Sequence, residues 1–137
     1  MGNARASVLI VEDDPTILEI LIEGLGDEGY RATGATALGD AIAALRAGRF
    51  DLVLSDAFRP TAVDAPVEQW RPLESLRDAA GDTPIIIVTA HRLDDYADYR
   101  ARGFAAVLAK PFDLDRLFET VRSVLQEQQG TGMCVDD

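Results

Sequence analysis

The chain has very little of the residue types that build disulfide frameworks or zinc sites. Among its 137 residues there is one cysteine, Cys134, and one histidine, His91. A single cysteine excludes an internal disulfide and fits a reducing compartment. No apolar run approaches the roughly 20 residues that span a bilayer, and the N-terminus lacks the apolar core of a signal peptide. We therefore expect a cytoplasmic protein with no membrane segment.

Positive charge is also scarce. The chain has 13 Lys and Arg against 24 Asp and Glu, which gives a formal net charge of −11, and Lys110 is its single lysine. An acidic surface repels the phosphates of nucleic acid and anionic lipid, so direct contact with nucleic acid is not expected. Most of this acidity is typical of solubility alone. A group of carboxylates at one metal site would account for part of the rest.

The sequence does contain short apolar runs that alternate with helical patterns. The runs without polar alternation are Ser7–Val11, Asp51–Ser55, Pro84–Thr89 and Ala105–Ala109, with Tyr30–Thr33 as a weaker fifth. Such runs are typical of strands covered on both faces. Five alternations of strand and helix predict an α/β fold with a parallel sheet and right-handed crossovers.

The helices are expected between these runs. The first has Asp14 as its N-cap and Pro15 at its first helical position, and Gly48 ends the second. A broken pattern over residues 57–71 predicts an extended loop, with a short third helix starting near Pro72. A fourth helix is expected over His91–Ala101, and the last over the apolar stripe from residue 114 to 125. Residues 1–129 are then one domain, and residues 130–137 a short C-terminal tail that is expected to be frayed.

Polar side chains follow four of the runs. They are Glu12, Asp13 and Asp14 after the first run, Asp56 after the second, Thr89 after the third, and Lys110 after the fourth. In open parallel sheets, ligands bind at the carboxyl ends of the strands. These groups are therefore expected to converge on one edge of the sheet, where Asp14 serves as a helix cap.

The convergence of three acids predicts a metal site. Two carboxylates ~6 Å apart at an effective dielectric near 20 repel by about 3 kcal/mol, so a cation is needed among them. Oxygen ligands without His or Cys select a hard ion, Mg²⁺ or Mn²⁺. With Lys110 and Thr89 beside it, Asp56 is suited to act as a nucleophile that forms an aspartyl phosphate.

The same stretches resemble response-regulator receiver domains, the CheY-like superfamily of two-component signalling. The resemblance rests on Val8–Pro15, Asp51–Asp56, Pro84–Ala90 and Lys110–Phe112, and it covers residues 7–128. It implies a flavodoxin-like, doubly wound sheet of five parallel strands in the order 2-1-3-4-5. This strand order comes from the family and is not worked out from the residues.

The resemblance also implies roles for individual residues. Asp56 would be the phosphoacceptor, with Thr89 as the switch hydroxyl and Lys110 as the cation that contacts the phosphoryl group. The metal ligands would be Glu12, largely through water, Asp13, Asp56 and the backbone carbonyl of Phe58. Lys110–Pro111 would be a cis peptide bond. Such a protein is not an enzyme beyond an intrinsic, magnesium-dependent autodephosphorylation.

The partners implied by the family are proteins. A sensor histidine kinase or a phosphotransfer protein would donate the phosphoryl group. Phosphorylation would then shift the face built from the fourth helix, the fifth strand and the fifth helix, which would bind a downstream target or a second copy of the chain. Two departures bear on this switch: Val107 stands where the family usually has an aromatic residue, and Arg59–Asp64 replaces the common Pro-x-Met-Asp-Gly run.

Three other interpretations remain open from the sequence. The chain would bind partners without phosphorylation if it were a receiver-like binding module, or a degenerate receiver that keeps only the fold. A haloacid-dehalogenase-like phosphatase also uses an aspartate nucleophile, but it has a second acid two residues later, where this chain has Phe58. Trp70 is expected to pack beneath the long loop rather than form a partner surface.

Overall fold

The computed structural model describes residues 6–56, 70–89, 96–110 and 113–136, with the last nine of these described by their backbone alone. In chain order the elements are β1 (Ser7–Val11), α1 (Pro15–Asp27), β2 (Arg31–Ala35), α2 (Leu38–Ala47), β3 (Leu52–Asp56), α3 (Arg71–Ala80), β4 (Ile85–Thr89), β5 (Ala106–Ala109) and α4 (Leu114–Asp136). All five predicted strands are present, each within two residues of its predicted ends.

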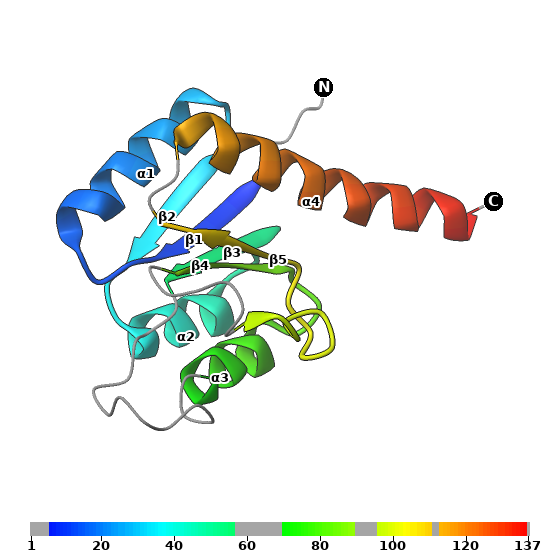
Figure 1. Cartoon of the computed structure of the whole chain (residues 1–137), viewed down its shortest axis with the longest axis horizontal. Coiled ribbons are helices and arrows are strands. Elements are labelled where there is room, and N and C mark those ends of the chain that lie inside the picture. The colour runs from blue at the N-terminus through cyan, green and yellow to red at the C-terminus, as the bar shows by residue number, and fades with distance from the viewer. Residues whose placement is uncertain (1–5, 57–69, 90–95, 111–112, 137) are drawn as a thin grey trace.

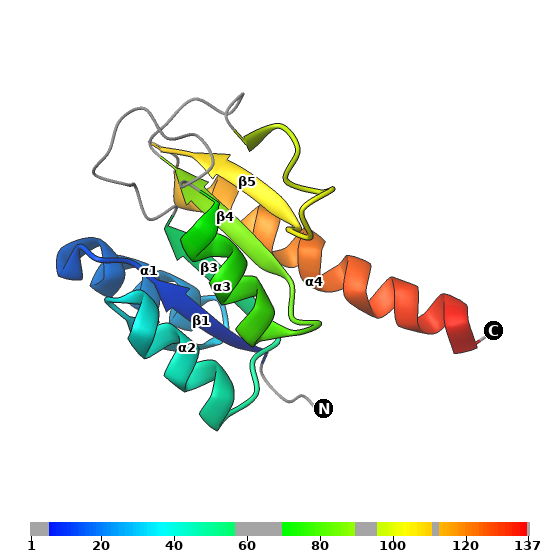
Figure 2. The same ribbon diagram turned by 90° about the horizontal axis from the view of Figure 1, so that it is seen from below.

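The strands form one parallel sheet in the order β2-β1-β3-β4-β5. Helices α1 and α4 cover one face of the sheet, and α2 and α3 cover the other (Figure 1). The second view shows α2 and α3 in front of the sheet, running along the direction of its strands (Figure 2). The predicted α/β fold, with the flavodoxin-like strand order, is therefore confirmed.

Each face of the sheet has its own apolar core, because successive side chains of a strand point to opposite faces. In β1, Val8 and Ile10 pack toward α1 and α4, whereas Leu9 and Val11 pack toward α2 and α3. All four of these side chains are buried. Burial on both faces explains why the central strands have no polar alternation in the sequence.

Local signals explain the helix boundaries near the carboxyl ends of the strands. The Asp14 side chain accepts hydrogen bonds from the backbone N–H groups of Thr16 and Ile17, which confirms it as the N-cap of α1. Gly48 follows the last residue of α2 as predicted. Helix α3 begins at Arg71, with Pro72 in its first turn. Because Asp14 caps α1, only a short connection separates β1 from this helix.

The helix predicted over His91–Ala101 is wrong for the part that the structure describes. Residues 96–103 form consecutive turns, in which Tyr99 N–H donates to the Tyr96 carbonyl at 3.1 Å and Gly103 N–H to the Arg100 carbonyl at 3.1 Å. Tyr96 and Phe104, at the two ends of this segment, both belong to the core beneath α3. Tight turns bring both rings into one core. Residues 91–95 lie outside the described part.

The last helix is longer than predicted. Helix α4 continues to Asp136, so the backbone of residues 130–136 is helical. Proline does not occur between residues 114 and 136. Each residue added to a nucleated helix gains a hydrogen bond, whereas Gly130 and Gly132 each cost only about 1 kcal/mol relative to alanine. The helix extends past the sheet (Figure 1). The domain boundary at residue 129 stays a prediction.

Among the described residues, the helices are too short or too polar for any of them to span a membrane.

Candidate functional site

The carboxyl edge of the sheet brings the predicted residues together. Glu12 and Asp13 directly follow β1, Asp56 and Thr89 are the last residues of β3 and β4, and Lys110 directly follows β5. The pairing of Val11 with Ser55 sets the end of β1 beside the end of β3. The pairing of Thr89 with Ala109 does the same for β4 and β5. Parallel pairing is therefore the reason that residues far apart in the sequence share one edge.

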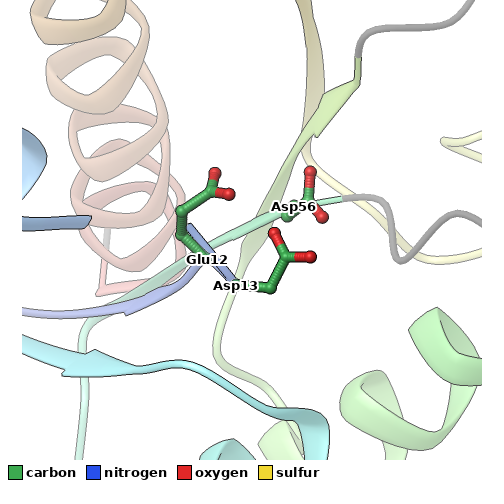
Figure 3. A group of neighbouring side chains, drawn as sticks. All are labelled: Glu12, Asp13 and Asp56. Carbon is green, nitrogen blue, oxygen red and sulfur yellow. The ribbon is translucent and has the colours of Figure 1, made fainter. Parts of the chain in front are cut away.

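Three carboxylates meet at this edge. Glu12, Asp13 and Asp56 each offer one carboxylate oxygen, and these oxygens lie within 4.8 Å of one another (Figure 3). Glu12 is buried, Asp56 is partly buried and Asp13 is exposed. The site thus grades from the protein interior to solvent. The predicted convergence of the acids is what the structure shows.

Lys110 joins two of these carboxylates. Its Nζ lies 3.2 Å from Glu12 Oε1 and 3.3 Å from Asp56 Oδ1. Burial lowers the pKa of Lys110, but the charges of Asp56 and Glu12 outweigh this effect, and its pKa is raised above the ordinary value. The ammonium group therefore stays charged at neutral pH.

The buried Glu12 carboxylate is the most perturbed acid of the site. Burial raises its pKa above the ordinary value, and the neighbouring charge of Asp56 acts in the same direction. The Asp14 backbone N–H, which donates to Glu12 Oε2 at 3.3 Å, and the Lys110 ammonium group act in the opposite direction. The favourable contacts of the Glu12 carboxylate thus do not fully offset the cost of burying its charge, and a further positive charge would stabilise the charged form.

Thr89 lies beside this cluster in a fixed backbone position. The residue is fully buried at the end of β4. Its carbonyl oxygen accepts a hydrogen bond of 2.7 Å from the backbone N–H of Lys110. A movement of the backbone at either residue would therefore change this hydrogen bond and act directly on the other.

The donor set fits a small, hard divalent cation. All three carboxylates supply oxygen ligands, which Mg²⁺ and Mn²⁺ prefer. Two ligands of one Mg²⁺ lie at most about 4.2 Å apart, because each is about 2.1 Å from the ion. The observed carboxylate oxygens need only small side-chain rotations to meet that limit, and water completes the coordination of such ions.

Some predicted features lie outside the described residues. These are the Phe58 backbone carbonyl, the loop over residues 57–69, the Lys110–Pro111 peptide bond and His91. The predictions made for them remain predictions.

Two contacts near the site were not foreseen from the sequence. One is the ion pair between Lys110 and Glu12, which holds the lysine side chain in place before any ligand binds. The other involves Ser55, a buried hydroxyl in an apolar strand, which donates to the Asp56 carbonyl at 2.8 Å. A single polar residue within the run Leu52–Ser55 was the available signal for the second contact. Trp70 is buried, and the loop beneath which it was predicted to pack lies outside the described residues.

The fold and the site define a flavodoxin-like α/β protein with an acidic cluster and a lysine at the carboxyl edge of its sheet. A family model described as the response regulator receiver domain matches residues 8–122, and the chain belongs to this family. The match includes the carboxylate cluster, Thr89 and Lys110.

Curated relatives agree with this assignment. The transcriptional regulatory protein PcoR of Escherichia coli is 29% identical over 129 residues, which are 93% of this chain and 55% of the relative. The transcriptional regulatory protein ZraR of Salmonella typhimurium is 33% identical over 136 residues, which are 96% of this chain and 29% of the relative. The chain thus spans about half or less of the length of these relatives.

Solved structures agree as well. A CheY-like receiver domain protein from Methanospirillum hungatei superposes with a TM-score of 0.80 at 27% identity, covering 93% of this chain and 99% of that one. The response regulator TrrA of Thermotoga maritima, solved in complex with Mg²⁺ and BeF, gives a TM-score of 0.69 at 28% identity over 87% of this chain and 98% of that one.

Proposed function

We propose that the chain receives a phosphoryl group on Asp56 from a sensor histidine kinase or a phosphotransfer protein, and that it signals through protein contacts in the cytoplasm. The observation that carries this proposal is the group of three carboxylate oxygens within 4.8 Å, with Lys110 Nζ 3.3 Å from Asp56 Oδ1. Repulsion among the acids favours cation binding, and the lysine favours an anionic product.

The transfer itself is an in-line displacement. One oxygen of the Asp56 carboxylate attacks phosphorus, a new O–P bond forms, and the P–N bond to the donor imidazole breaks. The electron pair of that bond stays on the imidazole nitrogen. Lys110 is placed to contact an oxygen of the transferring group, and the Thr89 hydroxyl would donate to another. The aspartyl phosphate then persists until water hydrolyses it.

Mg²⁺ or Mn²⁺ would be held by Glu12, Asp13, Asp56 and the Phe58 backbone carbonyl. When bound, the ion supplies positive charge that neutralises the transferring phosphoryl group. The chain's own contribution is to hold the three carboxylates close together before the ion arrives, so that little reorganisation is needed.

The receiver face would be formed by residues 96–104, β5 and α4, and we propose a protein target or a second copy of the chain as its partner. Direct binding to nucleic acid by this part of the chain is not proposed, because its net charge is −11. The relatives' names refer to transcription. The relatives themselves are much longer than the segment that matches this chain.

The test is incubation with acetyl phosphate and Mg²⁺, followed by intact mass measurement. Wild type should gain the mass of one phosphoryl group, and chelation of the metal should abolish the gain. Asp56→Asn should gain nothing. The matched control is Asp14→Asn. It removes a neighbouring acid of the same sequence run but keeps a side chain that caps α1 well, so it should be labelled like wild type. Labelling of Asp56→Asn would contradict the assignment, and an unlabelled wild type would favour a phosphorylation-independent binding module.

A further inference from the structure

A cluster of side chains around Trp70 joins two segments that leave the phosphoacceptor edge separately. Trp70 immediately precedes α3, on the chain that continues from β3 and Asp56. Tyr96, Arg102 and Phe104 lie on the chain that continues from β4 and Thr89 toward β5. The two segments meet again at the Trp70 ring.

The contacts in this cluster are of two kinds. The Trp70 ring stacks edge-on to Tyr96 at 5.3 Å between centroids, and its centroid lies 5.5 Å from that of Phe104. All three rings are buried, with exposed fractions of 3% or less. On the outer side the Arg102 guanidinium lies 4.4 Å from the Trp70 centroid. Aromatic packing and a cation–π contact therefore act on the same ring.

Arg102 is itself held by both segments. Its Nη1 lies 3.2 Å from Glu74 Oε2 on α3, and its Nε lies 2.8 Å from Asp98 Oδ2 on its own segment. The Arg102 carbonyl accepts a hydrogen bond from Arg77, also on α3. At Gly103 the backbone has φ of 96°, and a side chain there would approach Arg77 Cδ to 2.9 Å. The two segments are thus bound by side-chain and backbone contacts at once.

We propose that the clamp formed by Trp70, Arg102 and Glu74 couples α3 to residues 96–104, so that a change at the phosphoacceptor site moves both segments together. The inference rests on the proposed function and extends it, because it names α3 as part of the responding surface. Its physical basis is the two-sided attachment of Arg102. Displacing residues 96–104 alone would break its ion pair with Glu74 and its contact with the Trp70 ring.

The position of Val107 supports the proposed role of this clamp. In β5 this residue is aliphatic and partly buried, and it packs against the same core as Trp70, Tyr96 and Phe104. Three aromatic rings, those of Trp70, Tyr96 and Phe104, therefore meet at the contact between α3 and residues 96–104. We assign the transmission of the signal to that contact.

The experiment measures amide hydrogen exchange with and without beryllofluoride and Mg²⁺, which together mimic a phosphoryl group. In wild type, exchange should change both in α3 and in residues 96–104. In Arg102→Gln the response of α3 should fall at least twofold while residues 96–104 still respond. Arg100→Gln is the matched control, because Arg100 lies over Tyr99 and not over Trp70, and both segments should respond in it.

A second pair of variants tests the ion pair alone. Glu74→Gln should reduce the response of α3 at least twofold, whereas Asp82→Asn, which removes an exposed acid just after the same helix, should leave it unchanged. The fluorescence of Trp70, the single tryptophan, should shift on adding beryllofluoride and Mg²⁺ to wild type but not to Asp56→Asn.

The outcomes separate the two proposals. If wild type binds beryllofluoride and is labelled on Asp56, but α3 responds equally in wild type and Arg102→Gln, the clamp is overturned and the phosphoacceptor stands. Equal loss of the α3 response in Arg100→Gln would also overturn it. If wild type shows neither labelling nor any exchange change, the proposed function fails and the clamp fails with it.

Discussion

Asp13 is the exposed member of the carboxylate cluster, and its charge has opposite effects in the presence and absence of metal. Without metal it repels Glu12 and Asp56, whose oxygens lie within 4.8 Å. In the proposed metal site it would become a ligand. Because Asp13 faces solvent, screening reduces the repulsion well below the value for a buried pair.

We predict that Asp13→Asn raises the metal-free stability by at most about 1 kcal/mol, since one unfavourable charge is removed. The same variant should lose most of the stabilisation that Mg²⁺ gives to wild type. Urea unfolding with and without Mg²⁺ measures both effects. Asp82→Asn, an exposed acid that precedes β4 at the opposite edge of the sheet, is the control for a simple change of net charge. A large fall in metal-free stability of Asp13→Asn would contradict a repulsive cluster.

The raised pKa of Glu12 makes the stability of the protein depend on pH in the opposite direction to that expected for ordinary surface acids. Its pKa is raised in the folded protein, mainly by burial, so the folded state binds the Glu12 proton more tightly than the unfolded state does. The stability contributed by that proton is complete below the unfolded pKa. It is lost as the pH rises through the raised folded value.

We therefore predict that metal-free Glu12→Gln gains stability relative to wild type as the pH rises through this window. Glutamine keeps an oxygen that accepts from the Asp14 N–H, and it has no charge to bury. Thermal unfolding of both proteins across the acidic range, in the presence of a chelator, measures the difference. Glu19→Gln, on the exposed side of α1, should track wild type. A difference that stays constant with pH would show that the burial of Glu12 charge is not the cause.

At the scale of elements, the contact between α1 and β2 is unusually close. Gly34 of β2 faces α1, and a Cβ atom there would lie 2.9 Å from Ile22 Cδ1 and 3.0 Å from a Leu18 methyl carbon. Both leucine and isoleucine side chains pack in the core between α1 and the sheet. A residue larger than glycine at this position therefore requires the Ile22 and Leu18 side chains, or helix α1 itself, to shift.

We predict that Gly34→Ala destabilises the protein by roughly 1–3 kcal/mol, the usual range for overpacking. The control is Gly39→Ala in α2, where a Cβ would have nothing within 4 Å. That substitution should stabilise by up to about 1 kcal/mol, because alanine favours a helix over glycine. Denaturant unfolding measures both. Equal effects of the two substitutions would mean that the close approach of α1 carries no energetic weight.

The strands and most helix starts could be predicted because their signals are local. Runs such as Ile85–Thr89 are apolar throughout since both faces of β4 are covered, and Asp14 caps α1 through its own side chain. Residues 96–103 could not be predicted, because long-range packing of Tyr96 and Phe104 on Trp70 decides their conformation. The end of α4 was missed because two glycines weaken a helix without ending it.

The candidate site was predictable to the same degree as the sheet. Once the strands are parallel, residues that follow them share one edge, so Glu12, Asp13, Asp56, Thr89 and Lys110 could be grouped from the sequence. The burial of Glu12 and its pairing with Lys110 could not, because they depend on the side-chain conformation of a long lysine. Burial raises the pKa of Glu12, and the charges of Asp56 and Glu12 raise the pKa of Lys110; no spacing in the sequence indicates either effect.

At the scale of the whole molecule, the net charge of −11 and the acidic site both destabilise the metal-free protein, but they respond differently to ions. General repulsion among surface charges is screened by any salt, with a Debye length of about 10 Å at 0.1 M. The carboxylate cluster needs an ion that coordinates oxygen directly. Comparing Mg²⁺ with NaCl at equal ionic strength therefore separates the two contributions.

We predict that wild type gains about 2.7 kcal/mol when Mg²⁺ is present at a hundred times its dissociation constant, beyond the gain in NaCl of matched ionic strength. The extra gain arises because the ion binds the folded site and not the unfolded chain, in which Asp56 is far from Glu12 and Asp13. Differential scanning calorimetry in the two salts measures it. Asp13→Asn should retain only the gain common to both salts. If wild type responded equally to both salts, the acids would be acting only through the general charge of the surface, and the metal centre on which phosphoryl transfer depends would have to be abandoned.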